Sequence, residues 1–260
     1  MQTPDSLPML PRQIRLVLFD LDGTFADTAP DLAYALNRTL EIHGRSPLPL
    51  ERIRPQVSHG GVALIRLGFD IEPDDPGFET YRQKLLDIYQ RNLTRHTRLF
   101  PGMHELLRRL EKRGIGWGIV TNKPAWLTDP LMEQLNLTAR AACIVSGDTT
   151  ENRKPHPQPI LLACEIAGAD PLESIYVGDA ARDIEAGRSA GVTTLTARFG
   201  YIGEQDQTDQ EVLRYLRDGV EPQTYGIGIK ELWDIDPAKH REGTVMHGLG
   251  WPLSETSSTG

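Results

Sequence analysis

Cysteine is scarce in this chain, and its positions argue against two classes of protein. Only two cysteines occur among 260 residues, Cys143 and Cys164, and both lie inside apolar runs. Neither has a second cysteine or a histidine at the spacing of a zinc site. The sequence therefore favours reduced, buried thiols over a disulfide framework or a cysteine-bound metal.

Long apolar runs are also lacking. No stretch approaches the about 20 apolar residues that are needed to cross a bilayer, so we expect no membrane-spanning helix. The N-terminal segment "MQTPDSLPMLPRQ" is interrupted by three prolines and carries an aspartate, whereas a signal peptide has a basic start and a continuous apolar core. These features predict a cytoplasmic protein.

Basic residues are fewer than acidic ones. The chain has 28 lysines and arginines against 36 aspartates and glutamates, which gives a formal net charge of −8. No broad positive field is available for nucleic acid or for an anionic membrane, so we expect neither as a partner. With 39% hydrophobic residues, the chain can bury a full core as one large domain or as a domain with an insertion.

Short apolar runs alternate with amphipathic segments along most of the chain. The predicted strands cover residues 14–20, 115–122, 141–148, 174–179 and 191–197. Helical patterns lie between the later strands, at residues 103–114, 124–137, 157–169 and 181–191. Near-continuous apolar strands that alternate with helices are typical of parallel strands buried on both faces. The sequence predicts an α/β fold with a doubly wound, mainly parallel, Rossmann-like sheet.

The alternation is interrupted once. Between the first two predicted strands there is no strand pattern, and three helical stretches occur instead, at residues 30–44, 60–69 and 77–93. We interpret residues 27–98 as a small helical cap inserted after the first strand. The α/β core is then formed from residues 12–26 and 99–203, and residues 204–260 form an atypical C-terminal tail without the alternation.

Polar residues follow several of the predicted strands. Asp20 ends the first strand and Thr121 the second, Lys154 follows the third, and Asp179 ends the fourth. Ligands of open α/β sheets bind at the carboxyl ends of the strands, so we expect these side chains to converge. Each also has a purely structural interpretation: Asp179 could stabilise a helix N-terminus, and Thr121 and Lys154 could be a strand-end hydroxyl and a solvated lysine. Their joint occurrence in this order is more specific.

A calcium loop is a further interpretation of "DLDG", which begins at Asp20. That loop requires a glycine at about position six and a glutamate at about position twelve. Here Gly23 falls at position four and Asp31 at position twelve. The calcium-loop interpretation therefore fails.

Four segments together carry a family resemblance. They are "FDLDGTFADTAPD" (19–31), "VTNKP" (120–124), "KPHPQP" (154–159) and "VGDAARDIEAGRSAG" (177–191). With these segments in this order, the chain resembles the haloacid dehalogenase-like hydrolases, and within them the phosphoglycolate phosphatase family, from residue 12 to about residue 203. Phe25 and Ala26 depart from the leucine and valine that the family usually has there, which affects packing rather than chemistry.

The resemblance implies a phosphatase that acts through an aspartyl-phosphate intermediate. Asp20 would be the nucleophile and Asp22 the general acid and base. A phosphate dianion repels an attacking carboxylate by about 4 kcal/mol per charge pair at about 4 Å and an effective dielectric of about 20, so a cation is needed. By the resemblance, Mg²⁺ is bound by Asp20, Asp179 and the backbone carbonyl of Asp22, and Asp183 orders the outer shell. No organic cofactor is required.

The resemblance also assigns residues to the substrate. Thr121, the backbone N–H of Asn122, and Lys154 would hold the phosphate oxygens. In the family a loop between cap helices reaches the active site, and here it would be "VSHGG", residues 57–61. We predict contacts with the substrate from its central residues, Ser58, His59 and Gly60, although a lone histidine in a glycine-rich turn also fits a structural role.

The substrate itself stays open between two small phosphorylated metabolites. The cap segment at residues 77–103, followed by "WGIVTNKP", resembles the N-acetylmuramic acid 6-phosphate phosphatases of cell-wall recycling more than the phosphoglycolate phosphatases proper. A phosphomutase that shares Asp20 and Asp22 is an alternative, as is a noncatalytic phosphate-sensing module. A dehalogenase is disfavoured because it needs neither a metal nor an acid at Asp22. Either a monomer or a homodimer is compatible with the sequence.

The C-terminal tail carries a separate resemblance. Residues 221–260 resemble an internal piece of electron transfer flavoprotein-ubiquinone oxidoreductase. They lack the nucleotide-binding glycine motif of such flavoproteins, so we expect no bound flavin. One interpretation of this junction is a chimeric or misassembled reading frame.

Overall fold

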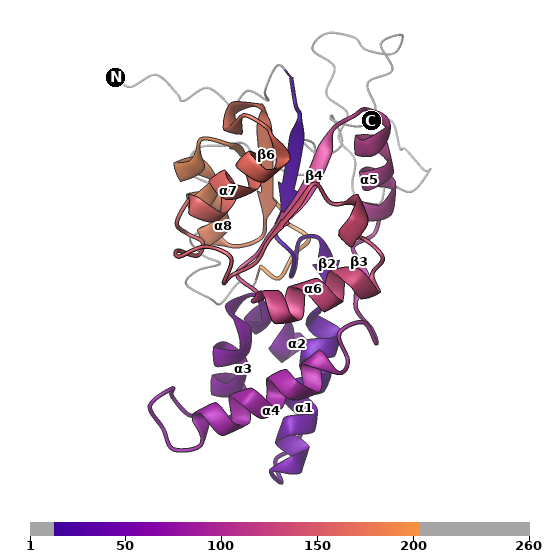
Figure 1. Cartoon of the computed structure of the whole chain (residues 1–260). Coiled ribbons are helices and arrows are strands. Elements are labelled where there is room, and N and C mark those ends of the chain that lie inside the picture. The colour runs from indigo at the N-terminus through magenta and orange to yellow at the C-terminus, as the bar shows by residue number, and fades with distance from the viewer. Residues whose placement is uncertain (1–12, 203–260) are drawn as a thin grey trace, which may run out of the picture.

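A five-stranded parallel sheet forms the centre of the molecule in the computed structural model, which describes residues 13–202 (Figure 1). The predicted tail at residues 204–260 lies outside the described residues. The strand order is β5-β4-β1-β6-β7. The strands are β1 (Leu16–Phe19), β4 (Gly116–Val120), β5 (Cys143–Val145), β6 (Ser174–Gly178) and β7 (Thr193–Thr196). β1 is the central strand, and Asp20 directly follows its carboxyl end.

Helices cover both faces of this sheet. They are α5 (Met103–Lys112), α6 (Ala125–Gln134), α7 (Gln158–Ala167) and α8 (Ala181–Ala190), with short 3₁₀ turns at Thr138–Arg140 and Pro171–Glu173. In β1, Val17 and Phe19 pack in one core with α5 and α6, whereas Leu16 and Leu18 pack in a second core with α7 and α8. Alternate residues of a strand face opposite sides, so β1 is apolar throughout. The prediction of a doubly wound α/β fold is confirmed.

The cap consists of helices that pack on one another beyond the carboxyl end of the sheet (Figure 1). They are α1 (Ala29–Ile42), α2 (Leu50–Ile53), the 3₁₀ helix η1 (Arg54–His59), α3 (Gly60–Phe69) and α4 (Phe78–Gln90). Helix α4 turns one apolar face inward and buries Phe78, Leu85 and Tyr89. Tyr81, on the same face, stacks on Phe69 with ring centroids 4.2 Å apart. The helical cap after the first strand is therefore present.

Two details of the cap correct the sequence-based expectation. No strand was expected within residues 27–98, but β2 (Ala26–Asp27) and β3 (Arg98–Leu99) pair antiparallel at the two ends of this region. Residues 57–61 are not an open loop, since they complete η1 and begin α3. Gly60 links these two helices with a φ of 75°, a conformation that glycine adopts without strain.

No helix within residues 13–202 combines the length and the apolar character that crossing a membrane requires. This agrees with the lack of long apolar runs in the sequence.

Candidate active site

Four of the predicted site residues lie at the carboxyl edge of the sheet. Asp20 follows β1, Thr121 follows β4, and Asp179 follows β6. Lys154 belongs to the segment between β5 and α7. All four are buried. For the charged side chains of Asp20, Lys154 and Asp179, burial is unusual unless they are paired or bind a ligand.

Lys154 holds two of the predicted aspartates together. Its Nζ lies 2.7 Å from Oδ1 of Asp20 and 2.7 Å from Oδ1 of Asp183. It is also 2.9 Å from the carbonyl of Val120 and 2.7 Å from the Tyr176 hydroxyl. Burial disfavours the charged ammonium, but the carboxylates of Asp183 and Asp20 outweigh burial and raise the pKa of Lys154. Lys154 is therefore a fixed cation beside Asp20.

Three carboxylates form a compact buried cluster. Oxygens of Asp20, Asp179 and Asp183 all lie within 4.8 Å of one another. Burial, together with the charges of Asp20 and Asp183, raises the pKa of Asp179 to about 8. Burial likewise raises the pKa of Asp20, against the opposing effect of Lys154. Negative charge is thus in excess at this point, and oxygen ligands at this spacing suit a hard cation. The cluster can hold a divalent metal ion.

The geometry around the cluster is tightly constrained. Asp179 accepts a hydrogen bond from the backbone N–H of Tyr201 at 2.9 Å, and Asp183 accepts one from the backbone N–H of Ala180 at 3.0 Å. Gly178 lies against Asp183, and a Cβ at Gly178 would be only 2.3 Å from the Asp183 Cβ. The carboxylates are therefore positioned by the backbone before any ligand arrives.

Asp22 lies in a separate polar group that sequence reasoning did not foresee. Nζ of Lys123 is 2.9 Å from Oδ1 and 3.1 Å from Oδ2 of Asp22, and the Thr28 hydroxyl donates to Oδ1. Lys123 also donates to the Tyr89 hydroxyl of cap helix α4 at 3.0 Å. Burial lowers the pKa of Lys123, but the charge of Asp22 outweighs it, so the pKa is raised. Asp22 is thus linked to the cap through Lys123.

One of the predicted cap residues, Ser58, approaches the carboxylate cluster. The hydroxyl of Ser58 is 3.3 Å from Oδ2 of Asp179, and Arg182 of α8 donates from Nη2 to the Ser58 carbonyl at 2.7 Å. Arg182 is a second cation near the cluster that was not predicted. Burial lowers the pKa of Arg182, but the charges of Asp183, Asp20 and Asp179 outweigh burial, so the pKa is raised overall.

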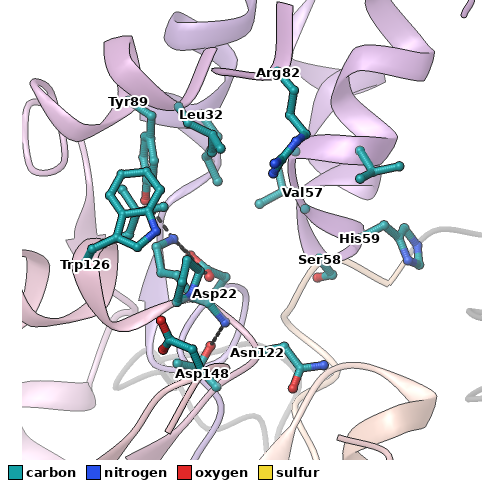
Figure 2. A pocket seen from close by; sticks show the side chains of 18 of the residues that line it. Asp22, Leu32, Val57, Ser58, His59, Arg82, Tyr89, Asn122, Trp126 and Asp148 are labelled. Carbon is teal, nitrogen blue, oxygen red and sulfur yellow. Dashed lines mark hydrogen bonds and ion pairs between the residues drawn. The ribbon is translucent and has the colours of Figure 1, made fainter. Parts of the chain in front are cut away.

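A cavity of about 920 Å³ separates the cap from the core (Figure 2). Of the predicted site residues, Asp20, Asp22, Thr121, Asn122, Ser58, His59 and Gly60 line it. Lys154, Asp179 and Asp183 are buried next to Asp20 and are not among the lining residues. Asn122 and Lys154 exchange two hydrogen bonds: the Asn122 side chain donates to the Lys154 carbonyl at 2.9 Å, and the Lys154 N–H donates to Oδ1 at 3.0 Å. These bonds fix the segment that carries Lys154.

The site combines a candidate nucleophile, a candidate proton donor and a candidate cation site at one edge of the sheet. The sequence around it matches a known family. Residues 17–197 match the sequence profile of the haloacid dehalogenase-like hydrolases. The chain belongs to this family.

Curated members of the haloacid dehalogenase-like hydrolases extend the match. The chain is 42% identical over 194 residues to N-acetylmuramic acid 6-phosphate phosphatase of Pseudomonas putida, covering 75% of this chain and 87% of the relative. It is 40% identical over 192 residues to phosphoglycolate phosphatase of Xylella fastidiosa, covering 74% and 83%. The crystal structure of a predicted phosphoglycolate phosphatase from Haemophilus somnus has a TM-score of 0.67 and 27% identity, covering 76% of this chain and 91% of that one.

The predictions of family, fold and phosphatase class are thereby confirmed for this haloacid dehalogenase-like hydrolase. The tail resemblance is also confirmed as a similarity, since residues 225–260 match the family described as ETF-QO, ubiquinone-binding. Those residues lie outside the described part of the chain.

Proposed function

We propose that this phosphatase is magnesium-dependent and hydrolyses N-acetylmuramic acid 6-phosphate through an aspartyl-phosphate formed on Asp20. The observation that carries the proposal is the placement of Asp20: it lines the cavity, pairs with Lys154 and belongs to the three-carboxylate cluster. Asp20 thus borders the cavity, and the ammonium of Lys154 lies 2.7 Å from its carboxylate. The proposed catalytic, metal and phosphate-binding roles are those that the family resemblance implies.

The proposed chemistry has two displacements. An oxygen of Asp20 attacks phosphorus, a new O–P bond forms, and the ester P–O bond breaks. Asp22 gives its proton to the departing alkoxide and then takes a proton from a water molecule. The oxygen of that water forms a new bond to phosphorus, the bond between Asp20 and phosphorus breaks, and inorganic phosphate leaves. Nζ of Lys123, 2.9 Å from Oδ1 of Asp22, would hold this carboxyl in place during both displacements.

The remaining polar groups would bind the transferring phosphate. Thr121 and the backbone N–H of Asn122 would donate to its oxygens, and Lys154 would offset their charge. A bound Mg²⁺ would be held by Asp20, Asp179 and the carbonyl of Asp22, with Asp183 ordering the outer shell. It would supply the positive charge that reduces repulsion between carboxylate and phosphate dianion.

The choice of substrate rests on similarity and on the cavity. The relative with 42% identity is named for N-acetylmuramic acid 6-phosphate, and those with 40% for phosphoglycolate. A cavity of about 920 Å³ is at the upper end of the about 300–1,000 Å³ of small-molecule sites, which favours the sugar over the two-carbon acid. 2-Phosphoglycolate stays the alternative. Cytoplasmic location and a monomeric or homodimeric state stay predictions.

Phosphate release from a panel of esters, measured with Mg²⁺ as kcat/KM, tests the proposal. We expect N-acetylmuramic acid 6-phosphate to exceed 2-phosphoglycolate, and Asp20→Asn to abolish release while the fold stays intact, because an amide is not a nucleophile. Asp129→Asn, an exposed change on α6, is the matched control and should leave turnover unchanged. Activity of Asp20→Asn within tenfold of the wild type would exclude the covalent route, and isomerisation of a sugar phosphate without phosphate release would indicate a phosphomutase.

A further inference from the structure

The cavity is also lined by two side chains that have no role in the proposed chemistry, Trp126 and Arg82. Trp126, on the first turn of α6, lines the cavity and is 40% exposed. Trp117, by contrast, is buried to 1% exposure within the core. An indole left open to a cavity offers an apolar face to a ligand. Tyr89 of cap helix α4 lines the same cavity, and Trp126 and Tyr89 are both labelled in Figure 2.

Arg82 of cap helix α4 lines the same cavity, and Figure 2 shows its guanidinium directed into it. Nε and Nη2 of Arg82 lie 2.8 and 2.7 Å from the carboxylate oxygens of Glu79. A guanidinium has five N–H donors, so the donors of Nη1 are not used by Glu79. The ion pair is solvent-exposed on the Glu79 side and therefore weak. The ion pair orients Arg82, and Glu79 competes only weakly with a ligand carboxylate for the guanidinium.

Phosphate esters differ in how far their other charged groups lie from the phosphate. With phosphorus at Asp20, the carboxylate of a two-carbon phosphoester stays beside the phosphate, close to Asp22 and Lys123. A sugar 6-phosphate extends farther, because a whole ring lies between its phosphate and the substituents on the opposite side. The apolar face of a sugar ring suits an indole, and a carboxylate suits the planar donors of an arginine.

We propose that Trp126 and Arg82 form a subsite for a sugar ring that carries a carboxylate remote from its phosphate. This inference rests on the proposed function of the same site, and it assigns the recognition of the alcohol part of the substrate to two residues. Trp126 packs against the ring, and Arg82 pairs with the carboxylate.

Arg82→Gln tests the carboxylate contact with two substrates that differ in one group. N-acetylmuramic acid 6-phosphate carries a lactyl carboxylate, and N-acetylglucosamine 6-phosphate does not. Hydrogen bonds to a charged group are strong enough that we expect kcat/KM to fall about 10- to 100-fold on the first substrate and to change less than about threefold on the second. Arg66→Gln is the matched control, since Arg66 forms an ion pair with Glu72 in the cap but does not line the cavity.

Trp126→Leu tests the ring contact. The change keeps an apolar side chain at a partly exposed position, so folding should persist. We expect KM to rise about two- to tenfold for both sugar phosphates, as for the loss of an aromatic contact, and to stay unchanged for 2-phosphoglycolate. Equal increases for all three esters would overturn the role of Trp126.

The results separate this inference from the function on which it rests. If the wild type releases phosphate but Arg82→Gln affects both sugars equally, or neither, the subsite is wrong and the phosphatase proposal stands. If no ester is hydrolysed, the proposed function fails, and calorimetric titration of wild type and Arg82→Gln with the two sugar phosphates decides the subsite. Selective weakening of the carboxylated sugar then supports the subsite, and equal binding overturns it.

Discussion

The buried carboxylate cluster makes a quantitative prediction about stability and pH. In the absence of a divalent cation, Asp179 has a pKa of about 8 in the folded protein, compared with an ordinary value of 3.8. Between these values the folded state holds a proton that the unfolded state has released. Stability must therefore be highest near and below pH 4 as far as Asp179 is concerned, and must decrease as pH rises toward about 8.

The size of this effect follows from proton linkage. One proton of difference changes the free energy of unfolding by up to about 1.4 kcal/mol per pH unit. For a domain of about 150–250 residues, that corresponds to a decrease in Tm of about 3–5 °C per pH unit. Asp20, whose pKa is also raised, acts in the same direction. Asp183, whose pKa is lowered, contributes only below about pH 4.

Magnesium should reverse the trend, because it competes with the proton for Asp179. At about 100 times its Kd a ligand adds about 2.7 kcal/mol of stability, so Mg²⁺ should raise Tm by several degrees at pH 8 and much less at pH 5. Thermal unfolding with EDTA or with Mg²⁺, at pH 5, 6, 7 and 8, measures both effects. Asp179→Asn is the control and should flatten the dependence on pH in EDTA. If Mg²⁺ stabilised the protein equally at pH 5 and pH 8, the assignment of Asp179 to a cation site would be wrong.

Three other changes probe separate parts of the molecule. Asp22→Asn should lower kcat by about 10² to 10⁴, the usual contribution of general acid–base catalysis; steady-state phosphate release measures it, and a loss below tenfold would remove Asp22 from proton transfer. Gly178→Ala should destabilise the protein by about 1–3 kcal/mol in urea unfolding, because its Cβ would lie 2.3 Å from that of Asp183; unchanged stability would contradict the close approach. Truncation after Val220 should leave kcat nearly unchanged, and the full-length protein should show no flavin absorbance; a stoichiometric flavin would refute this interpretation of the tail.

The strand-end residues could be placed from the sequence alone because parallel strands end at one edge of a sheet. Asp20, Thr121 and Asp179 each follow an apolar run, and the α/β alternation fixes the direction of those runs. Their convergence therefore requires no knowledge of side-chain packing. The catalytic, metal-binding and phosphate-binding roles of these residues stay predictions.

The contacts between cap and core could not be predicted in this way. The spacing of apolar residues can place Tyr89 on the buried face of α4, but its hydroxyl meets Lys123 only because of how the cap packs on the core. Lys123 lies inside the "VTNKP" segment, so its position close to the end of a strand can be predicted from the sequence, whereas its contact with Asp22 cannot. The position of Arg182 near the carboxylate cluster can be predicted in the same way, because Arg182 lies in the first turn of α8, three residues after Asp179.

Short elements were missed for a different reason. The strands β2 and β3 have two residues each, which is too short for a period of two to be visible. Residues 57–61 contain Gly60 and Gly61 and are expected to be a loop, yet Gly60 itself takes a φ of 75° and begins α3.

The pairing of β2 with β3 has a consequence for how such a protein can change over evolution. Ala26 lies opposite Leu99, and Asp27 opposite Arg98, so the cap leaves and re-enters the core at adjacent points, about one strand spacing apart. A segment attached at neighbouring points can be lengthened, shortened or exchanged without moving the sheet. An exchange of residues 28–97 would enter and leave the core at these two points, but it would also replace Thr28, Ser58 and Tyr89, which contact Asp22, Asp179 and Lys123. A grafted cap must therefore supply its own partners for these three residues if the carboxylates are to keep their positions.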